Sequence, residues 1–279
     1  MNQDEINTNK DSLWKFIENA SNNTIDRKDS ETWSKEWASF STHGVISGLG
    51  IGQSDFLWNA RSNRQIKKVF TCVWNNQQLL TSFDGCGVFR DWRYNSAWKT
   101  TGGCNHVDQN PETKPHRCCI QGLLSLTDQN ETTGGLVVYP QTHSHFKQLS
   151  DVVKNNNDYV TVSNIHPIMN QGKTLVHCNS PATTIEERNK NEPVDLLRIV
   201  AYVSMSSITL INAQTIFDEF RGKRKEMVEN NCKLTHWSTE FVVGGGGNNT
   251  DTDLSKLSLD KFNVHQKALI FSFDDENNE

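Results

Sequence analysis

The pattern of apolar and polar positions predicts helices before residue 75 and mainly strands after it. Apolar residues recur three and four positions apart in the segments 13–20, 31–40, 55–61 and 65–74, which gives each segment one apolar face as a helix. Ser54 stands directly before the third segment, where a serine side chain can cap the first turn. Shorter apolar runs bounded by polar turns predict strands at 79–83, 106–108, 120–127, 136–139, 159–162, 174–178, 196–205 and 267–273.

Further helices are expected at 146–153 and 212–231, and polar loops elsewhere. Because most of the apolar runs are short, we expect a mainly β fold whose helices pack outside the sheets. A chain of 279 residues can bury a sizeable core, and no repeat marks a boundary, so we expect one domain over residues 1–279. The polar ends, 1–10 and 274–279, predict disordered tails.

Charge, cysteine usage and hydropathy predict a cytoplasmic protein. The net charge of −5 provides no basic surface for nucleic acid. The seven cysteines form no Cys-x-x-Cys pair and no regular framework, which indicates reduced, mostly buried thiols. We see no apolar leader and no apolar run of membrane-spanning length, and therefore expect no membrane span. The sequence does not indicate an oligomeric state.

A His-x-Asp pair at positions 106–108 carries the strongest chemical signal. Residues i and i+2 of a strand share a face, so the His106 imidazole and the Asp108 carboxylate can bind one ion together. Such a pair is two thirds of the 2-His-1-carboxylate triad, which holds Fe(II) and leaves coordination positions open. His-x-Asp also arises by chance beside surface turns. The residues that follow it must therefore distinguish a metal-binding pair from a surface pair.

The stretch 104–146 resembles the phytanoyl-CoA dioxygenase-like family. The resemblance is carried by four motifs in order, HVDQ, QGLLSLTD, GGLVVYP and THSH, and it extends with lower similarity over about residues 58–237. Members of that family are Fe(II)- and 2-oxoglutarate-dependent oxygenases built on a double-stranded β-helix, a cupin-like jelly roll. The resemblance therefore implies this fold, with Fe(II) as cofactor and 2-oxoglutarate as cosubstrate.

The second histidine of the triad is expected from a distant strand, and His177 fits best. It follows an apolar run and lies 177 − 106 = 71 residues after His106, which leaves room for the intervening strands. Its segment also resembles the T-V-H-C-N sequence around the family's distal iron ligand. His143 and His145 are the nearest competitors, in a segment that resembles the family's P-G-S-H turn. The strand at 170–176 looks shorter than in the family, which keeps open a barrel without an intact iron site.

Arg198 is the one basic residue inside the apolar strand predicted at 196–205. A buried charge is costly without a partner, so this position indicates either an anionic ligand or a salt bridge to an internal acid. A guanidinium can bind a carboxylate through two parallel hydrogen bonds. Because the strand also resembles the family's cosubstrate strand, we expect Arg198 to bind the C5 carboxylate of 2-oxoglutarate. Gln121 is a second candidate for a polar contact with the cosubstrate.

Together these features predict an Fe(II)/2-oxoglutarate-dependent dioxygenase that hydroxylates a small organic metabolite, consumes O2 and releases succinate and CO2. His106, Asp108 and His177 would be its metal ligands and catalytic residues. Related halogenases lack the carboxylate ligand, so Asp108 argues for hydroxylation or a related oxidation. Two alternatives stay open: a non-catalytic barrel acting as a binding or scaffold module, and a zinc-dependent hydrolase with the same three ligands. The buried cation Arg198 argues against the hydrolase.

Overall fold

The structure is a computed structural model, and its contacts divide the chain into two compact units. The described residues are 1–37, 40–103, 105–116, 119–140, 158–162, 176–184, 187–189, 191–212, 215–242 and 255–273. Unit 1 comprises Met1–Val88, Cys119–Leu126 and Ile199–Glu279, and unit 2 comprises Phe89–Cys118 and Thr127–Arg198. The single domain expected over residues 1–279 stays a prediction.

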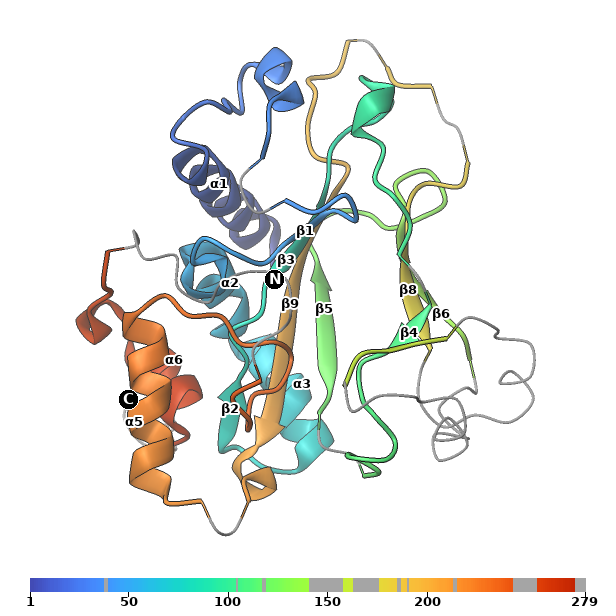
Figure 1. Cartoon of the computed structure of the whole chain (residues 1–279). Coiled ribbons are helices and arrows are strands. Elements are labelled where there is room, and N and C mark those ends of the chain that lie inside the picture. The colour runs from blue at the N-terminus through green and yellow to red at the C-terminus, as the bar shows by residue number, and fades with distance from the viewer. Residues whose placement is uncertain are drawn as a thin grey trace. The chain divides into compact units, whose positions relative to one another are not determined.

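Unit 1 is built on a sheet around the long strand β9 (Arg198–Ser207) (Figure 1). β9 pairs antiparallel with β2 (Leu79–Thr81) and with β5 (Gln121–Ser125). β3 (Cys86–Phe89) is also next to β9 in the sheet and pairs antiparallel with β1 (Val45–Ile46). Nine of the ten residues of β9 are buried, as its apolar run predicts. β5 confirms the strand predicted at 120–127, although none of its residues is fully buried.

Several helices of unit 1 begin where a polar side chain caps the first turn. Its helices are α1 (Gln3–Ala20), η1 (Ser30–Ser34), η2 (Ile51–Gln53), α2 (Asp55–Arg61), α3 (Arg64–Trp74), η5 (Ile208–Leu210), α5 (Phe217–Glu229), η6 (Leu259–Lys261) and α6 (Val264–Phe271). The Ser54 side chain accepts a hydrogen bond from the Leu57 N–H at the start of α2, and Asn63 caps α3 in the same way. Each cap satisfies a backbone donor that the helix leaves unpaired. The helices predicted at 55–61 and 65–74 are confirmed.

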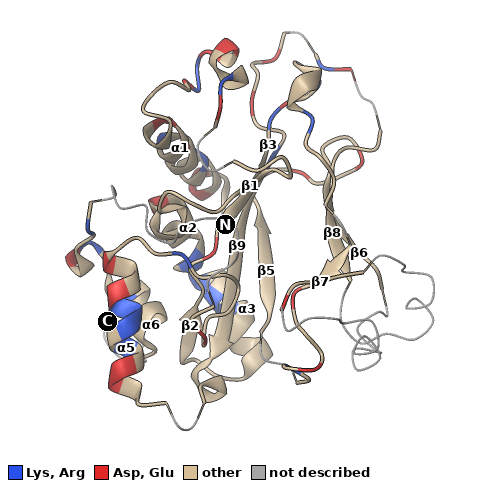
Figure 2. Ribbon diagram, viewed as in Figure 1, with Lys and Arg blue, Asp and Glu red and all other residues tan. Residues whose placement is uncertain are grey.

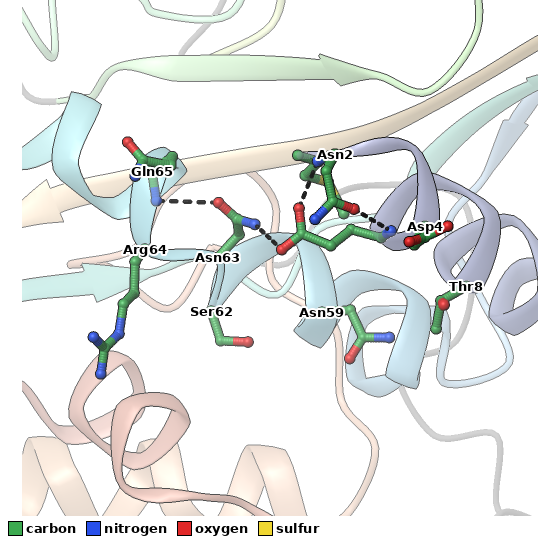
Figure 3. A pocket seen from close by; sticks show the side chains of 10 residues that line it. Asn2, Asp4, Thr8, Asn59, Ser62, Asn63, Arg64 and Gln65 are labelled. Carbon is green, nitrogen blue, oxygen red and sulfur yellow. Dashed lines mark hydrogen bonds between the residues drawn. The ribbon is translucent and has the colours of Figure 1, made fainter.

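The N-terminal segment is helical, although its polarity predicted a disordered tail. The Asn2 side chain accepts from the Glu5 N–H, and the Glu5 carboxylate accepts from the Asn2 N–H at 2.7 Å. The other oxygen of Glu5 accepts from the Asn63 amide, 3.4 Å away (Figure 3). These side chains help to line a polar cavity of about 700 Å³. The reciprocal cap pairs two backbone donors at once, which starts α1 at Gln3 although its first residues are polar.

Tryptophans form the core beneath α1. The rings of Trp14 and Trp33 lie 4.7 Å apart, and Trp37 contacts both at 5.8 and 6.1 Å. All three are buried, so Trp33 and Trp37 are packing residues. The helix predicted at 31–40 is limited to the five-residue η1.

The last strand predicted from the sequence, at 267–273, is wrong, because the segment belongs to helix α6. Asn263 and Gln266 form a capping box at its start, and Ala268 to Ile270 are buried. A short apolar run is compatible with either a buried strand or a buried helix, and here the cap favours the helix. α5 is shorter than the helix expected at 212–231, and it carries interspersed acidic and basic residues (Figure 2).

Unit 2 contains a second antiparallel sheet of four strands in the order β6-β8-β4-β7. Its strands are β4 (His106–Val107), β6 (Gly135–Val138), β7 (Val160–Thr161) and β8 (His177–Ser180), and the short helix η3 (Ser96–Trp98) precedes them. An apolar cluster of Val107, Val160, Val162 and Val176, with Tyr139 packed against it, covers one face of this sheet. Residues that alternate with these valines therefore belong to the opposite face.

The described residues thus form antiparallel sheets with flanking helices, which confirms a β-rich fold with helices at its periphery. No helix in the described ranges is long and apolar enough to cross a membrane. Five cysteines in these ranges are free thiols, namely Cys72, Cys86, Cys119, Cys178 and Cys232. Only Cys86 of these five is buried, so the expectation of mostly buried thiols is wrong for this part of the chain. The helix predicted at 146–153 and the tail at 274–279 lie outside the described residues.

Candidate metal centre

The burial of Val107 determines where its two neighbours point. Val107 is fully buried in the apolar cluster of unit 2 and lies opposite Val160 in the β4–β7 pairing. Because successive side chains of a strand alternate between faces, His106 and Asp108 both lie on the other face of the sheet. Their exposed side-chain fractions are 16% and 18%, so both are shielded but reachable. The predicted sharing of a face by the His-x-Asp pair is confirmed.

The pairing of β4 with β8 supplies the second histidine. His106 and His177 are direct partners in the register of the two strands, and their ring centroids lie 4.3 Å apart. On the other side of β8, His177 is opposite Val138 of β6. Val176 is fully buried on the apolar face, which turns His177 toward the face of the first histidine. Two histidines 71 residues apart in sequence thus become cross-strand neighbours.

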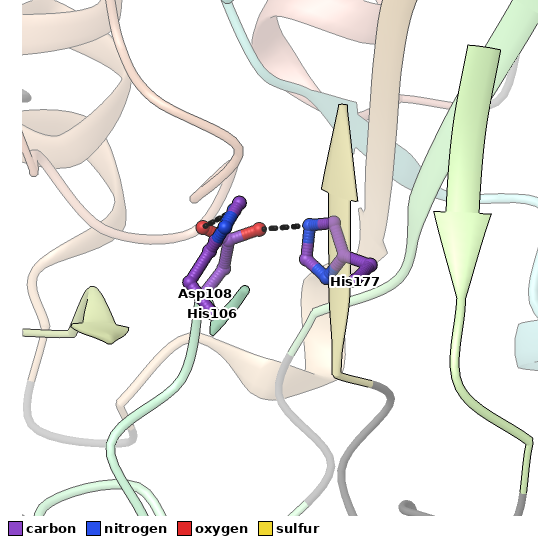
Figure 4. A group of neighbouring side chains, drawn as sticks. All are labelled: His106, Asp108 and His177. Atoms are coloured by element: carbon purple, nitrogen blue, oxygen red, sulfur yellow. Dashed lines mark ion pairs between the residues drawn. The ribbon is translucent and has the colours of Figure 1, made fainter. Parts of the chain in front are cut away.

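The Asp108 carboxylate is paired with a ring nitrogen of each histidine (Figure 4). One carboxylate oxygen is 3.1 Å from His177 Nε2, and the other is 3.6 Å from His106 Nε2. One ligand atom from each of the three residues lies within 4.8 Å of the others. Among the residues that the structure describes, no other group of three or more His, Cys, Asp or Glu side chains converges in this way.

The donor set fits a divalent transition metal ion. Two ligands that are each about 2.1 Å from one ion lie at most about 4.2 Å apart, and the separations of 3.1 and 3.6 Å agree with that limit. Two imidazole nitrogens and one carboxylate oxygen are the ligands of non-haem Fe(II) sites, and the same combination of two histidines and a carboxylate also holds zinc. Three protein ligands leave coordination positions for other molecules. The group can therefore hold a metal that also binds a small molecule.

Arg198, the predicted cosubstrate residue, is 1% exposed at the start of β9. Its Nη1 donates to Asn179 Oδ1 at 2.6 Å, and its Nε donates to Gln129 Oε1 at 3.3 Å. The guanidinium also lies 4.8 Å from the ring of Phe89. Asn179 is two residues after His177 on β8, so both side chains belong to the same face of the sheet. The arginine is thus hydrogen-bonded to the strand that carries the second histidine.

The remaining predicted site residues belong to unit 1 or lie outside the described residues. Gln121 is exposed and begins β5 in unit 1, opposite Ser204, and its contact with the cosubstrate stays a prediction. His143 and His145, the competing histidines, lie outside the described residues, as does most of the shortened strand before His177.

Sequence reasoning missed the side chains that surround the predicted residues. Asn179 and Gln129 bind Arg198, and Tyr159 stacks on His106 with ring centroids 4.5 Å apart. Only Asn179 had a local signal, since it stands two positions after His177 on the same strand. Gln129 and Tyr159 approach through chain pairing that no nearby residue pattern reveals.

The fold and the site together define a β-rich protein with a candidate 2-His-1-carboxylate metal centre. No family model matches the chain, and no solved structure matches it. The chain is 28% identical over 134 residues to "Ava biosynthesis cluster protein O" of Aspergillus versicolor, which covers 48% of this chain and 42% of that protein. It is 28% identical over 160 residues to "Putative phytanoyl-CoA dioxygenase" of Dictyostelium discoideum, which covers 45% of each.

These relatives confirm the resemblance to the phytanoyl-CoA dioxygenase-like family that the motifs indicated. The chain spans a little under half the length of either relative, so the similarity concerns a part of each protein.

Proposed function

We propose that this protein is an Fe(II)- and 2-oxoglutarate-dependent dioxygenase that hydroxylates a small organic metabolite. The observation that carries the proposal is the register of β4 and β8, which sets His177 beside His106, with the Asp108 carboxylate close to Nε2 of both rings. The name of the Dictyostelium relative supports it independently. We further propose that the two antiparallel sheets belong to one double-stranded β-helix domain, the fold that the resemblance implies.

In this proposal His106, Asp108 and His177 hold the iron through two nitrogens and one oxygen. When bound, iron and 2-oxoglutarate supply the oxidising chemistry, in which O2 is consumed, the cosubstrate becomes succinate and CO2, and the substrate gains oxygen. The protein's own contribution is to fix the ligands on one face of a sheet and to leave the remaining positions open. Asp108 occupies the position that a halide takes in related halogenases, which favours hydroxylation.

Arg198 would bind the C5 carboxylate of 2-oxoglutarate. A guanidinium keeps its charge when buried and presents parallel donors that match a carboxylate. The hydrogen bonds to Asn179 and Gln129 would hold its plane while it binds. Both acceptors are neutral amides, so neither contributes a negative charge that would compete with an incoming carboxylate. Gln121 is retained as a proposed second contact of the cosubstrate.

An anaerobic titration of the purified protein with Fe(II) and 2-oxoglutarate tests the proposal. Binding of the keto acid to the iron produces a visible charge-transfer band. We expect this band in the wild type, its loss in His177→Ala, and a much higher 2-oxoglutarate requirement in Arg198→Ala. Arg198→Lys keeps the charge but loses the planar fork, so its requirement is expected to lie between those of the wild type and Arg198→Ala. The exposed His116→Ala serves as the histidine control and should leave the band unchanged.

A folded wild-type protein that gives no band would refute the assignment and favour the non-catalytic binding or scaffold barrel. Tight binding of zinc with hydrolytic activity and no band would favour the zinc hydrolase. A band that persists in His177→Ala would assign the third ligand to another residue.

A further inference from the structure

Tyr159 lies directly against the ring of a proposed metal ligand. Its ring is stacked on the His106 imidazole, with centroids 4.5 Å apart and planes inclined by 29°. The strand register explains the contact, because Thr161 is opposite His106 and Tyr159, two positions earlier, belongs to the same face. Tyr159 remains 47% exposed, so its position is not imposed by burial in the core.

An ion pair connects the start of β7 with the turn that follows Asp108. Lys114 Nζ lies 2.7 Å from Asp158 Oδ2, and the exposed fractions of the two side chains are only 16% and 19%. The turn itself is closed by the Lys114 N–H, which donates to the Asn110 carbonyl at 2.9 Å. Asp158 directly precedes Tyr159. The turn after Asp108 is therefore connected through the Lys114–Asp158 ion pair to Tyr159, whose ring stacks on His106.

These contacts add support to β4, which backbone hydrogen bonds alone hold only weakly. The strand has only two residues, so few backbone hydrogen bonds hold it, and the imidazole can rotate about its side-chain torsions. Contacts around a metal ligand fix its ring orientation, and their loss typically costs about 10- to 100-fold in metal affinity. We propose that Tyr159 is a positioning residue that holds the His106 imidazole in its metal-binding orientation, and that the Lys114–Asp158 ion pair fixes Tyr159 in place. The inference rests on the proposed function, because it takes His106 as a metal ligand.

Calorimetric and visible titration of the apoprotein with Co(II) tests this without any turnover. Co(II) binds to nitrogen and oxygen sites of this kind, and its visible spectrum reports the geometry of its ligands. We expect Tyr159→Ala to weaken Co(II) binding about tenfold and to alter the spectrum, at the lower end of the range for lost supporting contacts. Tyr159→Phe keeps the stacked ring and should bind within about twofold of the wild type, since the ring rather than the hydroxyl makes the contact.

Tyr94→Ala is the matched control. Tyr94 belongs to the same unit, is 40% exposed and stacks on Trp98 at 5.4 Å with an inclination of 28°, and the Arg188 guanidinium also lies 5.6 Å from its ring. We expect this variant to keep wild-type Co(II) affinity and spectrum. A general loosening of unit 2 would affect both tyrosine variants alike, and circular dichroism measures whether each is folded.

The ion pair provides a second, independent variant. Lys114→Met should weaken Co(II) binding in the same direction by about threefold. Combined with Tyr159→Ala it should cause little further loss, because effects transmitted through one side chain are not additive. If Tyr159→Ala fails to fold, Tyr159→Leu keeps apolar bulk without a planar ring and is expected to show the same tenfold loss.

The outcomes separate the two proposals. A wild-type protein that binds no Co(II) would contradict the metal centre itself. Wild-type binding with equal affinities for Tyr159→Ala and Tyr94→Ala would overturn the positioning role and leave the centre intact. Equal losses in Tyr159→Phe and Tyr159→Ala would also overturn it, because the hydroxyl and not the stacked ring would then be responsible. Fully additive losses of Co(II) affinity in the double variant would show that the Lys114–Asp158 ion pair does not act through Tyr159.

Discussion

Arg224 is a buried cation whose removal gives a quantitative prediction for the stability of unit 1. It lies on α5 and is completely buried. Its Nε donates to the Ile270 carbonyl at 2.6 Å, its Nη1 donates to Ser238 at 2.9 Å, and its Nη2 donates to Thr81 at 2.7 Å. These carbonyls belong to α6, to a loop and to β2, so one side chain joins α5 to three other segments.

The cost of losing this side chain follows from the groups it leaves behind. Burial, and secondarily the charge of Arg61, lowers the pKa of Arg224 from 12.5 to about 9, so it is still cationic at neutral pH. In Arg224→Met, three buried carbonyls lose their donor, and each unsatisfied buried group costs about 1–3 kcal/mol. Relief from burying the charge offsets part of that sum. We therefore expect a loss of about 3–5 kcal/mol, a large share of the roughly 5–15 kcal/mol that stabilises a typical domain.

Urea unfolding followed by circular dichroism measures this loss. With an m-value of about 2 kcal/mol/M, a fall of about 4 kcal/mol lowers the midpoint by roughly 2 M. Lys225→Met is the control on the same helix, because Lys225 is 54% exposed and its pair with Glu229 is a surface contact worth at most a few tenths of a kcal/mol. A shift in Arg224→Met no larger than that of Lys225→Met would refute the reasoning, since the carbonyls would then not depend on the guanidinium.

Two further predictions concern glycines and cysteines. Gly134→Ala should destabilise the protein by about 1–3 kcal/mol in urea unfolding, because the φ of +82° disfavours a side chain and the added Cβ would lie 2.6 Å from the Ser180 carbonyl oxygen. Gly222→Ala should instead stabilise it by about 0.5–1 kcal/mol, because Gly222 lies inside α5 and its added Cβ would meet no neighbouring group within 4 Å. Equal changes in the two variants would contradict both predictions. Burial raises the pKa of the Cys86 thiol and shields it, whereas Cys72 is exposed. In a thiol-labelling experiment read by mass spectrometry, Cys72 should react in the folded protein and Cys86 only after unfolding. Labelling of both at similar rates would show that Cys86 is accessible.

Elements with local signals could be predicted from the sequence, and elements set by contacts could not. The Ser54 cap and the apolar spacing after it suffice for α2, because both lie within one helical turn. The apolar run at 267–273 fits a strand as well as a buried helix, and its cap at Asn263 stands four residues before the run begins. The polar start of α1 gave no periodic signal, since a cap rather than an apolar face begins the helix.

The same distinction applies to the candidate site. The shared face of His106 and Asp108 follows from a period of two residues, and the apolar strand around Arg198 marked it as a buried cation. The stacking of Tyr159 and the hydrogen bond from Arg198 to Asn179 depend on which strands become neighbours, and that is a property of the whole unit. Local patterns can therefore name candidate site residues, whereas the side chains that contact them require the structure.

The apolar pattern nevertheless determines which side chains of β8 share a face with His106. A slip of one residue would turn Cys178 toward His106 and would bring the His177 imidazole to the face where Val107 is buried. Burying a polar ring among valines while exposing Val176 would cost free energy on both counts. The apolar cluster thus excludes the one-residue slips that would place the two histidines on opposite faces. The candidate metal ligands His106 and His177 thus share a face because valines occupy the opposite face of the sheet.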